Sequence, residues 1–482
     1  MAPVNLLERA DVAVGSGVDA LVRAHHRRRL RRIGWGIAFD PSGRLWADGE
    51  PPPRAGNEID VLIDGANALP RIAAALASAE SHVYVAGWYL STELALARKG
   101  ERIVLIDLLA ELARRVPVRV LLWAGAPLPL FRPSRSDVRE LGRRLRAIGV
   151  EVGLDARERP LHCHHEKLVA VDDRLASVGG IDLTTYCGDR FDSNEHPYRA
   201  ALGWHDVAAL VRGPVVADVA AHFRFRWQEV TGQRLPAPAV PAAAGRHELQ
   251  LVQTVPEKVY PARPRGQFRI LQAYIRAFRS AERLIYVESQ FLWSPELVEI
   301  LADKLERPPG DDFRIVAVLP SHPQSGNDDS RGQVGVLVAA DGGAGRFLAC
   351  ALYSRRDGRA EPIYVHAKVA VVDDRWLTLG SANLNEHSLF NDTEVNLVSC
   401  EPELARETRE RLWAEHLELP LDEVRGRDPV ELVDERWLPI AHEQLERRDR
   451  GEPLTHRLVR LPGVSRRSRG ALGPLQGLVV DG

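Results

Sequence analysis

Two segments of the chain carry the same unusual set of polar residues inside otherwise apolar stretches. Both follow the pattern His-x-Lys-x4-Asp-x6-Gly-(Gly or Ser)-x-(Asp or Asn), the first from His165 and the second from His366, with equivalent positions 201 residues apart. Side chains two positions apart share one face of a strand and lie about 7 Å apart along it, so each histidine would project beside its lysine, Lys167 or Lys368. Two matched copies indicate one site built from both segments, rather than hairpin residues with no shared chemistry.

The pattern supplies two groups of candidate site residues. We expect the catalytic group to comprise His165, Lys167, Asp172, His366, Lys368 and Asp373. We expect a supporting or substrate-binding group of Gly180, Asp182, Ser381, Asn383, Asp206 and Glu394. Within the first group, Asp172 and Asp373 fall at predicted hairpin turns, so they should hold the hairpin or a lysine rather than touch substrate.

Two imidazoles and two ammonium groups at one site suit a phosphodiester. One neutral histidine can attack phosphorus, and the other, protonated, can give its proton to the leaving oxygen. Lys167 and Lys368 would neutralise the non-bridging oxygens as charge develops, without a metal ion. A carboxylate on the far ring nitrogen would fix each tautomer, and Asp206 and Glu394 are the best candidates by their matching places in the repeat.

The elements that must position these residues alternate between strand and helix. In the first half we predict strands at 58–62, 82–89, 118–123 and 207–211, helices at 66–79, 102–115, 137–148 and 214–228, and a hairpin of 165–171 and 175–178. In the second half we predict helices at 267–280, 297–305 and 403–415, strands at 284–291, 313–319 and 394–398, a polar loop at 326–332, and the second hairpin. Such alternation favours an α/β fold. The repeat predicts two similar α/β/α lobes with mixed sheets, related by a pseudo-twofold axis.

The domain boundaries follow from the same reading. We predict an N-terminal extension at 1–58, a first lobe at 59–235, a Pro/Ala-rich linker at 236–246, a second lobe at 247–418 and a charged C-terminal extension at 419–482, whose Gly/Arg/Ser-rich end we expect to be disordered. The first extension contains a helical pattern at 18–33 with a basic run at 25–32. That run fits either a solvated helix face or a contact with phospholipid headgroups.

Composition limits the partners and cofactors. A net charge of −2 gives no electrostatic footprint for nucleic acid, so no nucleic-acid partner is expected. Four scattered cysteines form no C-x-x-C pair, and the run His162-Cys163-His164-His165 has no counterpart beside His366, so we expect no metal and no cofactor. The N-terminus lacks a signal-peptide pattern and no apolar run could span a bilayer. We therefore expect a cytoplasmic protein, with peripheral contact to the inner membrane left open, and a monomer because both motifs are in one chain.

Both copies match the HKD motif of the phospholipase D superfamily. HHEKLVAVDDRLASVGGIDL followed by RFD, EHP and WHD resembles the phospholipid-cleaving phospholipases D, as does ERLIYVESQF, and GSANLNEHSLFNDTEVNLV is similar to the C-terminal motif of that group and of cardiolipin synthases. The resemblance covers roughly residues 59–418. It implies the two-lobe fold, a phosphohistidine intermediate with His165 as nucleophile and His366 as acid and base, and transfer of a phosphatidyl group from a phospholipid at a membrane surface to water or an alcohol.

The chain also departs from that family. Gly180 and Asp182 stand where many members have Ser and Asn, and the segment 184–187 is expected to alter the headgroup pocket. Calcium or phosphoinositide dependence is not supported, because the chain has no room for the appended lipid-binding modules. Three alternatives remain: a cardiolipin synthase-like phosphatidyltransferase, a nuclease of the same superfamily and, from another class, a non-enzymatic scaffold.

Overall fold

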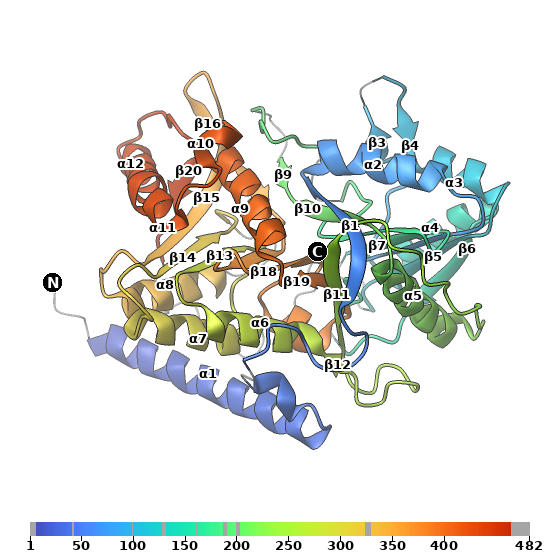
Figure 1. Ribbon diagram of the computed structural model, residues 1–482, viewed down its shortest axis with the longest axis horizontal. Coiled ribbons are helices and arrows are strands. Elements are labelled where there is room, and N and C mark those ends of the chain that lie inside the picture. The colour runs from blue at the N-terminus through green and yellow to red at the C-terminus, as the bar shows by residue number, and fades with distance from the viewer. Residues whose placement is uncertain are drawn as a thin grey trace.

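The computed structural model describes residues 6–40, 43–98, 100–127, 132–160, 162–186, 190–198, 203–322 and 329–463. Its core is a pair of mixed sheets that lie side by side, each with helices packed against it (Figure 1). The α/β prediction is therefore confirmed.

Seven strands of the first lobe follow one another across the first sheet. Their order is β1 (Arg54–Ile63), β10 (Val207–Arg212), β8 (Leu175–Gly179), β7 (Leu168–Val171), β2 (Val83–Gly87), β5 (Val118–Trp123) and β6 (Glu151–Asp155). The neighbours β2, β5 and β6 are parallel, and the other pairs are antiparallel. Strand β6 was not predicted, because Gly153 and two acidic ends interrupt its apolar alternation.

The second sheet repeats this order strand for strand. It runs β11 (His247–Val255), β19 (Glu394–Ser399), β18 (Trp376–Gly380), β17 (Val369–Val372), β13 (Leu284–Glu288), β14 (Arg314–Val318) and β15 (Phe347–Arg356). Again only the last three strands are mutually parallel. The predicted duplication is thus present in the topology as well as in the motifs.

The helices of each lobe cover its sheet and close its core. The first lobe has α2 (Gly65–Ala77), α3 (Leu105–Ala113), α4 (Arg135–Ala147) and α5 (Val215–Thr231), and the second has α6 (Arg269–Ser280), α7 (Pro295–Glu306), α8 (Asp329–Asp341) and α9 (Pro402–His416). Phe223 of α5 and Trp413 of α9 are fully buried in one apolar cluster that takes strand residues from both sheets. Since each fully buried side chain of this kind contributes about 1.5–3 kcal/mol, the shared core holds the lobes together.

Short elements join the lobes and flank the site. Strand β1 also pairs with β11, and β9 (Trp204–His205) pairs with β16 (Arg359–Val365), which extends the second sheet. A small ribbon of β3 (Ala95–Ala97) and β4 (Ile103–Val104) lies in the first lobe, and β12 (Gln267–Phe268) pairs with β11 in the second. The hairpin of β15 and β16 was not predicted.

Two further predictions need correction. The expected loop at 326–332 is partly outside the described residues, and Gly332 lies in α8, where burial of Val334 and Leu337 outweighs the low helix propensity of glycine. The C-terminal region is ordered through residue 463, with α10 (Leu421–Val424), α11 (Pro429–Leu432), η3 (Val433–Trp437), α12 (Leu438–Asp449) and β20 (Leu458–Arg460). Strand β20 pairs with β15 and Trp437 is fully buried, so this region belongs to the second lobe; its Gly/Arg/Ser-rich end lies outside the described residues.

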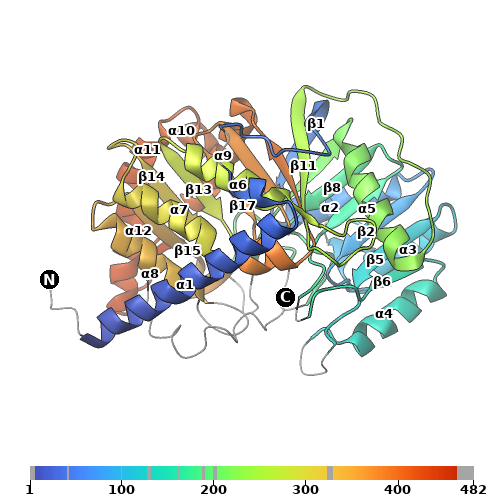
Figure 2. The same ribbon diagram turned by 90° about the horizontal axis from the view of Figure 1, so that it is seen from below.

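The N-terminal helix α1 (Leu6–Arg32) and the turn η1 (Gly36–Phe39) pack along the second lobe (Figure 2). Part of the basic run is engaged there: Arg29 forms an ion pair with Glu257 at 2.7 Å, and His26 Nδ1 lies 2.7 Å from Glu296. Within the described part of the chain, no helix combines the length and the apolar character that crossing a bilayer requires.

Candidate active site

The two motif histidines are held crosswise between the lobes. His165 Nδ1 lies 2.9 Å from Glu394 Oε1 of the second lobe, and His366 Nδ1 lies 2.7 Å from Asp206 Oδ2 of the first. The backbone repeats the crossing, because the His165 N–H donates to the Thr393 carbonyl at 3.0 Å and the His366 N–H to the His205 carbonyl at 2.8 Å. Each carboxylate therefore fixes the proton on Nδ1 and assigns reaction chemistry to Nε2.

This crossing follows from strand pairing. His164 forms a bridge with Thr393, and Tyr364 and Val365 pair with Trp204 and His205. In both cases the segment just before a motif histidine pairs with the segment just before the carboxylate of the other half. Neither lobe alone holds a complete imidazole–carboxylate pair.

The lysines lie beside the histidines, as their spacing requires. Lys167 Nζ donates to the His165 carbonyl at 2.8 Å and lies 3.8 Å from Asp182 Oδ2. Lys368 Nζ donates to the His366 carbonyl and to Gln290 Oε1 at 3.2 Å. All four histidine and lysine side chains are at least 96% buried, so a bound anion would meet both ammonium groups in a site with little competing water.

The small residues at the motif ends make room for the two carboxylates. A Cβ atom at Gly180 would overlap the Asp206 carboxylate, whereas Ser381 at the equivalent position donates its hydroxyl to Glu394. Glu394 also accepts the hydroxyl of Ser388 at 2.6 Å. Gly180 thus leaves room for the Asp206 carboxylate, and Ser381 donates a hydrogen bond to the Glu394 carboxylate.

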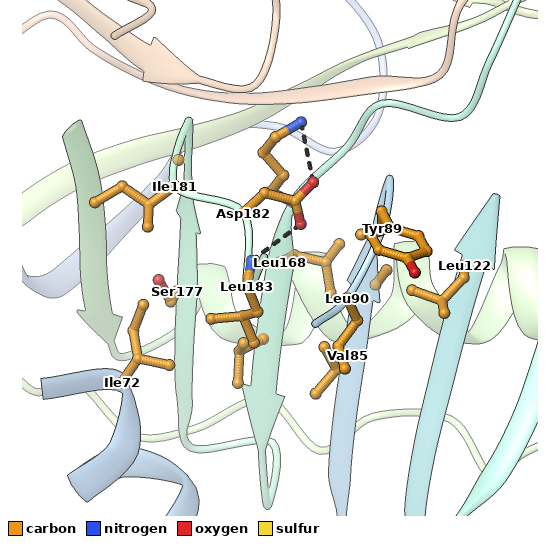
Figure 3. Close-up of a pocket in the computed structure, with 15 residues that line it drawn as sticks. Ile72, Val85, Tyr89, Leu90, Leu122, Leu168, Ser177, Ile181, Asp182 and Leu183 are labelled. Atoms are coloured by element: carbon orange, nitrogen blue, oxygen red, sulfur yellow. Dashed lines mark hydrogen bonds and ion pairs between the residues drawn. The ribbon is translucent and has the colours of Figure 1, made fainter. Parts of the chain in front are cut away.

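Asp182 forms an ion pair with Lys167, which Figure 3 marks with a dashed line from the labelled Asp182. Its carboxylate faces the lysine and accepts the Leu183 N–H at 3.1 Å. The cavity beside it is lined by apolar residues of β2, β7 and β8 and measures about 20 Å³, which is room for roughly one water molecule. Asp182 supports Lys167. The cavity beside it is too small for a phospholipid headgroup.

Burial and the nearby cationic side chains set the protonation states of His366 and its partner Asp206. Burial, Lys368, Arg190, Lys167 and His165 together hold the pKa of His366 well below its ordinary value. Burial also raises the pKa of Asp206 to about 7, against the opposing effect of Lys368. We conclude that without a bound anion His366 is neutral, because two nearby ammonium groups disfavour a third positive charge.

Asp172 and Asp373 bind backbone groups at the hairpin turns. Asp172 accepts the N–H groups of residues 80, 81 and 82 at 2.8–2.9 Å, and Asp373 accepts those of residues 282, 283 and 284 at 2.7–2.8 Å. Both lie at the opposite ends of β7 and β17 from the lysines. Lys167 and Asp172 are five residues apart, roughly 16 Å along a strand, so this geometry favours a role in holding the hairpin over the catalytic role expected from the motif.

Three residues of the site had not been singled out from the sequence. Gln290 accepts from Lys368 and, at 3.3 Å, from Asn383, so it links the second lysine to the motif asparagine. The ring of Trp204 lies 4.5 Å from that of His366, and the Arg190 guanidinium lies 3.5 Å from the Trp204 ring centre. The sequence signals were present, since Gln290 lies in ESQF and Trp204 begins WHD, but nothing in either pattern shows which residue it would contact.

The histidines of the run 162–165 contact different partners and do not meet at one point where an ion could bind. His162 Nδ1 lies 2.8 Å from His387 Nδ1, whereas His164 contacts Thr393 and Asp155. Of the segment 184–187, Thr184 is buried and bonded to Ser91, and Cys187 lies outside the described residues. Among the described residues, the groups of His, Cys, Asp and Glu close enough to share an ion do not include His165, His366 or their carboxylates.

Comparisons with known proteins agree with this geometry. Residues 274–415 match the family model described as "Cardiolipin synthase, PLD-like domain". The chain is 24% identical to phospholipase D A of Dictyostelium discoideum over 76% of its own length and 36% of that protein, and 24% identical to phospholipase D alpha 4 of Arabidopsis thaliana over 80% of its own length and 68% of that protein. It thus spans little more than a third of the Dictyostelium relative.

Among solved structures, phosphatidylserine synthase of Haemophilus influenzae Rd KW20 has a similar fold. The TM-score is 0.52 at 13% sequence identity, over 79% of this chain and 93% of that one. The matched family model and the relatives agree with the paired motifs, and the solved structure shares the fold. The chain is thus similar to the phospholipase D superfamily in its motifs, its sequence and its fold.

Proposed function

We propose that this protein is a phospholipase D-type phosphodiesterase and phosphatidyltransferase. It cleaves the headgroup phosphodiester of glycerophospholipids and gives phosphatidic acid or an exchanged phospholipid. The observation that carries the proposal is the crossed arrangement of two imidazole–carboxylate pairs with two buried lysines. Lys368, Lys167 and His165 all lie close enough to His366 to lower its pKa, so the two motifs contribute to one site.

In the first half-reaction, Nε2 of His165 attacks phosphorus and the bond from phosphorus to the headgroup oxygen breaks. The leaving oxygen takes a proton from His366, and the phosphatidyl group remains on His165. In the second, water or an alcohol attacks phosphorus while His366 takes its proton, and the nitrogen–phosphorus bond breaks. Lys167 and Lys368 neutralise the non-bridging oxygens in both steps. The reaction needs one histidine as the nucleophile and the other as the acid and base. The family resemblance assigns the nucleophile to His165.

The acid role requires a protonated His366, which the lysines oppose in the absence of substrate. A bound phosphodiester places a negative charge between Lys167 and Lys368 and so raises the pKa of His366 again. Substrate binding thereby supplies the condition for the first proton transfer.

The substrate and setting follow from the relatives. The curated relatives are phospholipases D, and the family model bears the name of a cardiolipin synthase domain. We infer a phospholipid substrate at a membrane surface, a water or alcohol acceptor, a monomeric enzyme and a cytoplasmic location with peripheral membrane contact. The name of the family model also favours the runner-up, a phosphatidyltransferase that joins two phosphatidyl units.

The test is a panel of phospholipids with different headgroups, incubated with the protein with and without a primary alcohol and followed by lipid mass spectrometry. We expect phosphatidic acid without alcohol and a phosphatidylalcohol with it, and neither product from the His366→Ala variant. Cardiolipin as the main product would support the runner-up. Failure of the protein to release any headgroup from the panel would contradict both.

A further inference from the structure

A second cluster of titratable residues lies directly behind the active site. Asp64, His196, His205 and Glu415 are all buried, and one ligand atom from each lies within 4.8 Å of all the others. Asp64, His196 and His205 come from the first lobe, whereas Glu415 lies near the end of α9 in the second. None of the four has a role in the proposed phosphodiester chemistry.

The four groups form a ring around a common centre. His205 Nδ1 lies 3.0 Å from Asp64 Oδ1 and 3.3 Å from Glu415 Oε1. His196 Nε2 lies 3.0 Å from Glu415 Oε1 and 3.2 Å from Asp64 Oδ2. Four ligands at about 2.0–2.1 Å from a tetrahedral ion are about 3.3 Å apart. The four nitrogen–oxygen separations are close to that value, and one ligand atom from each residue lies within 4.8 Å of the others, so a small contraction would place all four on zinc.

The outer nitrogen of each imidazole is also held by a carboxylate. His196 Nδ1 lies 3.1 Å from Asp192 Oδ2, and His205 Nε2 lies 2.7 Å from Glu288 Oε2. Metal-binding histidines are usually oriented in this way, because a carboxylate on the far N–H fixes the tautomer and makes the ligand nitrogen more basic. Both histidines of the ring have this second contact.

Both carboxylate oxygens of Asp64 face the ring. Its Oδ1 accepts from His205 and from the Asp206 N–H, and its buried Oδ2 lies 3.2 Å from His196 Nε2 without a well-aligned hydrogen bond. Its backbone has φ 63° and ψ 155°, and His196 has φ 44°. Such conformations cost on the order of 1–3 kcal/mol in a residue other than glycine and are found where a side chain must be aimed.

We propose that Asp64, His196, His205 and Glu415 bind one divalent transition-metal ion, with zinc the best match to two nitrogen and two oxygen ligands. The competing arrangement is a network of hydrogen bonds in which both imidazoles are cations. One divalent ion replaces the proton on His196 Nε2 and the proton on His205 Nδ1, so the total charge of the cluster is the same in both cases. Binding therefore releases about two protons per ion when it starts from that network.

The ion would join the lobes at the point where they build the active site. It binds three side chains of the first lobe and one of the second, and the His205 carbonyl accepts the N–H groups of His366 and Ala367 at 2.8 and 3.2 Å. It does not contact the reacting phosphodiester. The proposal is therefore independent of the proposed function, since metal content is measured without substrate.

The experiment measures metal in the full-length protein purified without chelators. We expect close to one zinc per chain by elemental analysis and native mass spectrometry, and a visible absorption spectrum of tetrahedral Co²⁺ after exchange. Asp64→Asn and His196→Gln should bind zinc at least ~100-fold more weakly, beyond the 10–100-fold typical of losing an outer contact. The matched control is His222→Gln, which removes another buried histidine, paired with Glu166 at 2.6 Å, and should keep its zinc.

A second measurement covers variants that fail to fold. The wild-type protein, unfolded and refolded with either Zn²⁺ or chelator, should have a higher Tm with zinc and should release about two protons per bound ion to a pH indicator. Wild-type protein that holds less than a tenth of an equivalent after exposure to Zn²⁺, with an unchanged Tm, would overturn the proposal in favour of the hydrogen-bonded network.

Discussion

At the scale of single residues, the site is defined by which carboxylate holds which imidazole. Glu394 of the second lobe holds His165 of the first, and Asp206 of the first holds His366 of the second. The matching places of these carboxylates in the repeat made them candidates from sequence, but only the strand pairing shows that the partners cross. The sequence pattern also grouped Asp172 and Asp373 with the catalytic residues, because spacing alone does not tell a turn aspartate from a site aspartate.

The first prediction concerns the two histidines. His165→Ala and His366→Ala should each lower turnover of a short-chain phospholipid by about 10³-fold or more, and the double variant should be little worse than either, since nucleophile and acid act as a unit. His25→Ala, which removes an exposed histidine of α1, should leave the rate unchanged. Retention of more than about a tenth of the rate by both single variants is incompatible with this mechanism.

The second prediction concerns Gly180, which stands where many members of the family have Ser. Gly180→Ser should inactivate the protein, because a side chain there overlaps the Asp206 carboxylate and displaces it from His366. Gly142→Ala on α4 comes close to the flexible end of Arg146 and makes ordinary van der Waals contact with Leu154 and Val152, so it should keep full activity. Steady-state kinetics decide the point: a Gly180→Ser variant as active as the wild type means that Asp206 has no need of that space.

At the scale of elements, each hairpin is anchored by one end and carries the site at the other. The turn aspartate binds three backbone N–H groups of the neighbouring segment, and the histidine and lysine lie before the first strand. Most strands and helices of both lobes could be predicted from their apolar spacing. Strands β6 and β16 could not, since their apolar faces are broken by charged residues, glycine or proline. Strand β15 has an apolar run from Phe347 to Tyr353, but a short run of this kind fits a buried helix as well as a strand.

The third prediction separates anchoring from catalysis. Asp172→Asn and Asp373→Asn should each lower the free energy of unfolding by about 1–3 kcal/mol, because three backbone N–H groups lose a charged acceptor, while the turnover of the folded protein changes little. Asparagine also accepts the positive φ of these turns. Asp357→Asn, at an exposed positive-φ turn, is the control for stability. A large fall in turnover at unchanged stability would return both aspartates to the catalytic group.

The fourth prediction concerns the effect of pH on Asp173, which follows the turn residue Asp172. Burial raises the pKa of Asp173, but hydrogen bonds from His82 and Arg224 outweigh it and lower the pKa to about 2. Since the folded pKa is below the unfolded one, the charged form contributes stability that is present above about pH 4 and lost as pH falls towards 2. Denaturant unfolding from pH 5 to 2.5 should show a shallower loss of stability in Asp173→Asn than in the wild type. Identical slopes would contradict the assignment.

At the scale of the whole molecule, two repeats form one candidate site because neither is complete alone. The repeat and the motif were visible in the sequence, so the lobes and the chemical groups could be predicted. The shared core around Phe223 and Trp413 and the C-terminal strand β20 could not, since they depend on contacts between segments more than 100 residues apart. The ring of Asp64, His196, His205 and Glu415 was hidden for the same reason.

In the proposed mechanism, a phosphatidyl group is carried on His165 between the two half-reactions. The most direct test uses the His366→Asn variant with a phosphodiester whose activated leaving group needs no proton, followed by acid quenching and peptide mass spectrometry. We predict a phosphatidyl adduct on the peptide that contains His165, and no adduct in the His165→Asn variant under the same conditions. An adduct on His366 in the His165→Asn protein, with none on His165 in the other variant, would contradict this assignment.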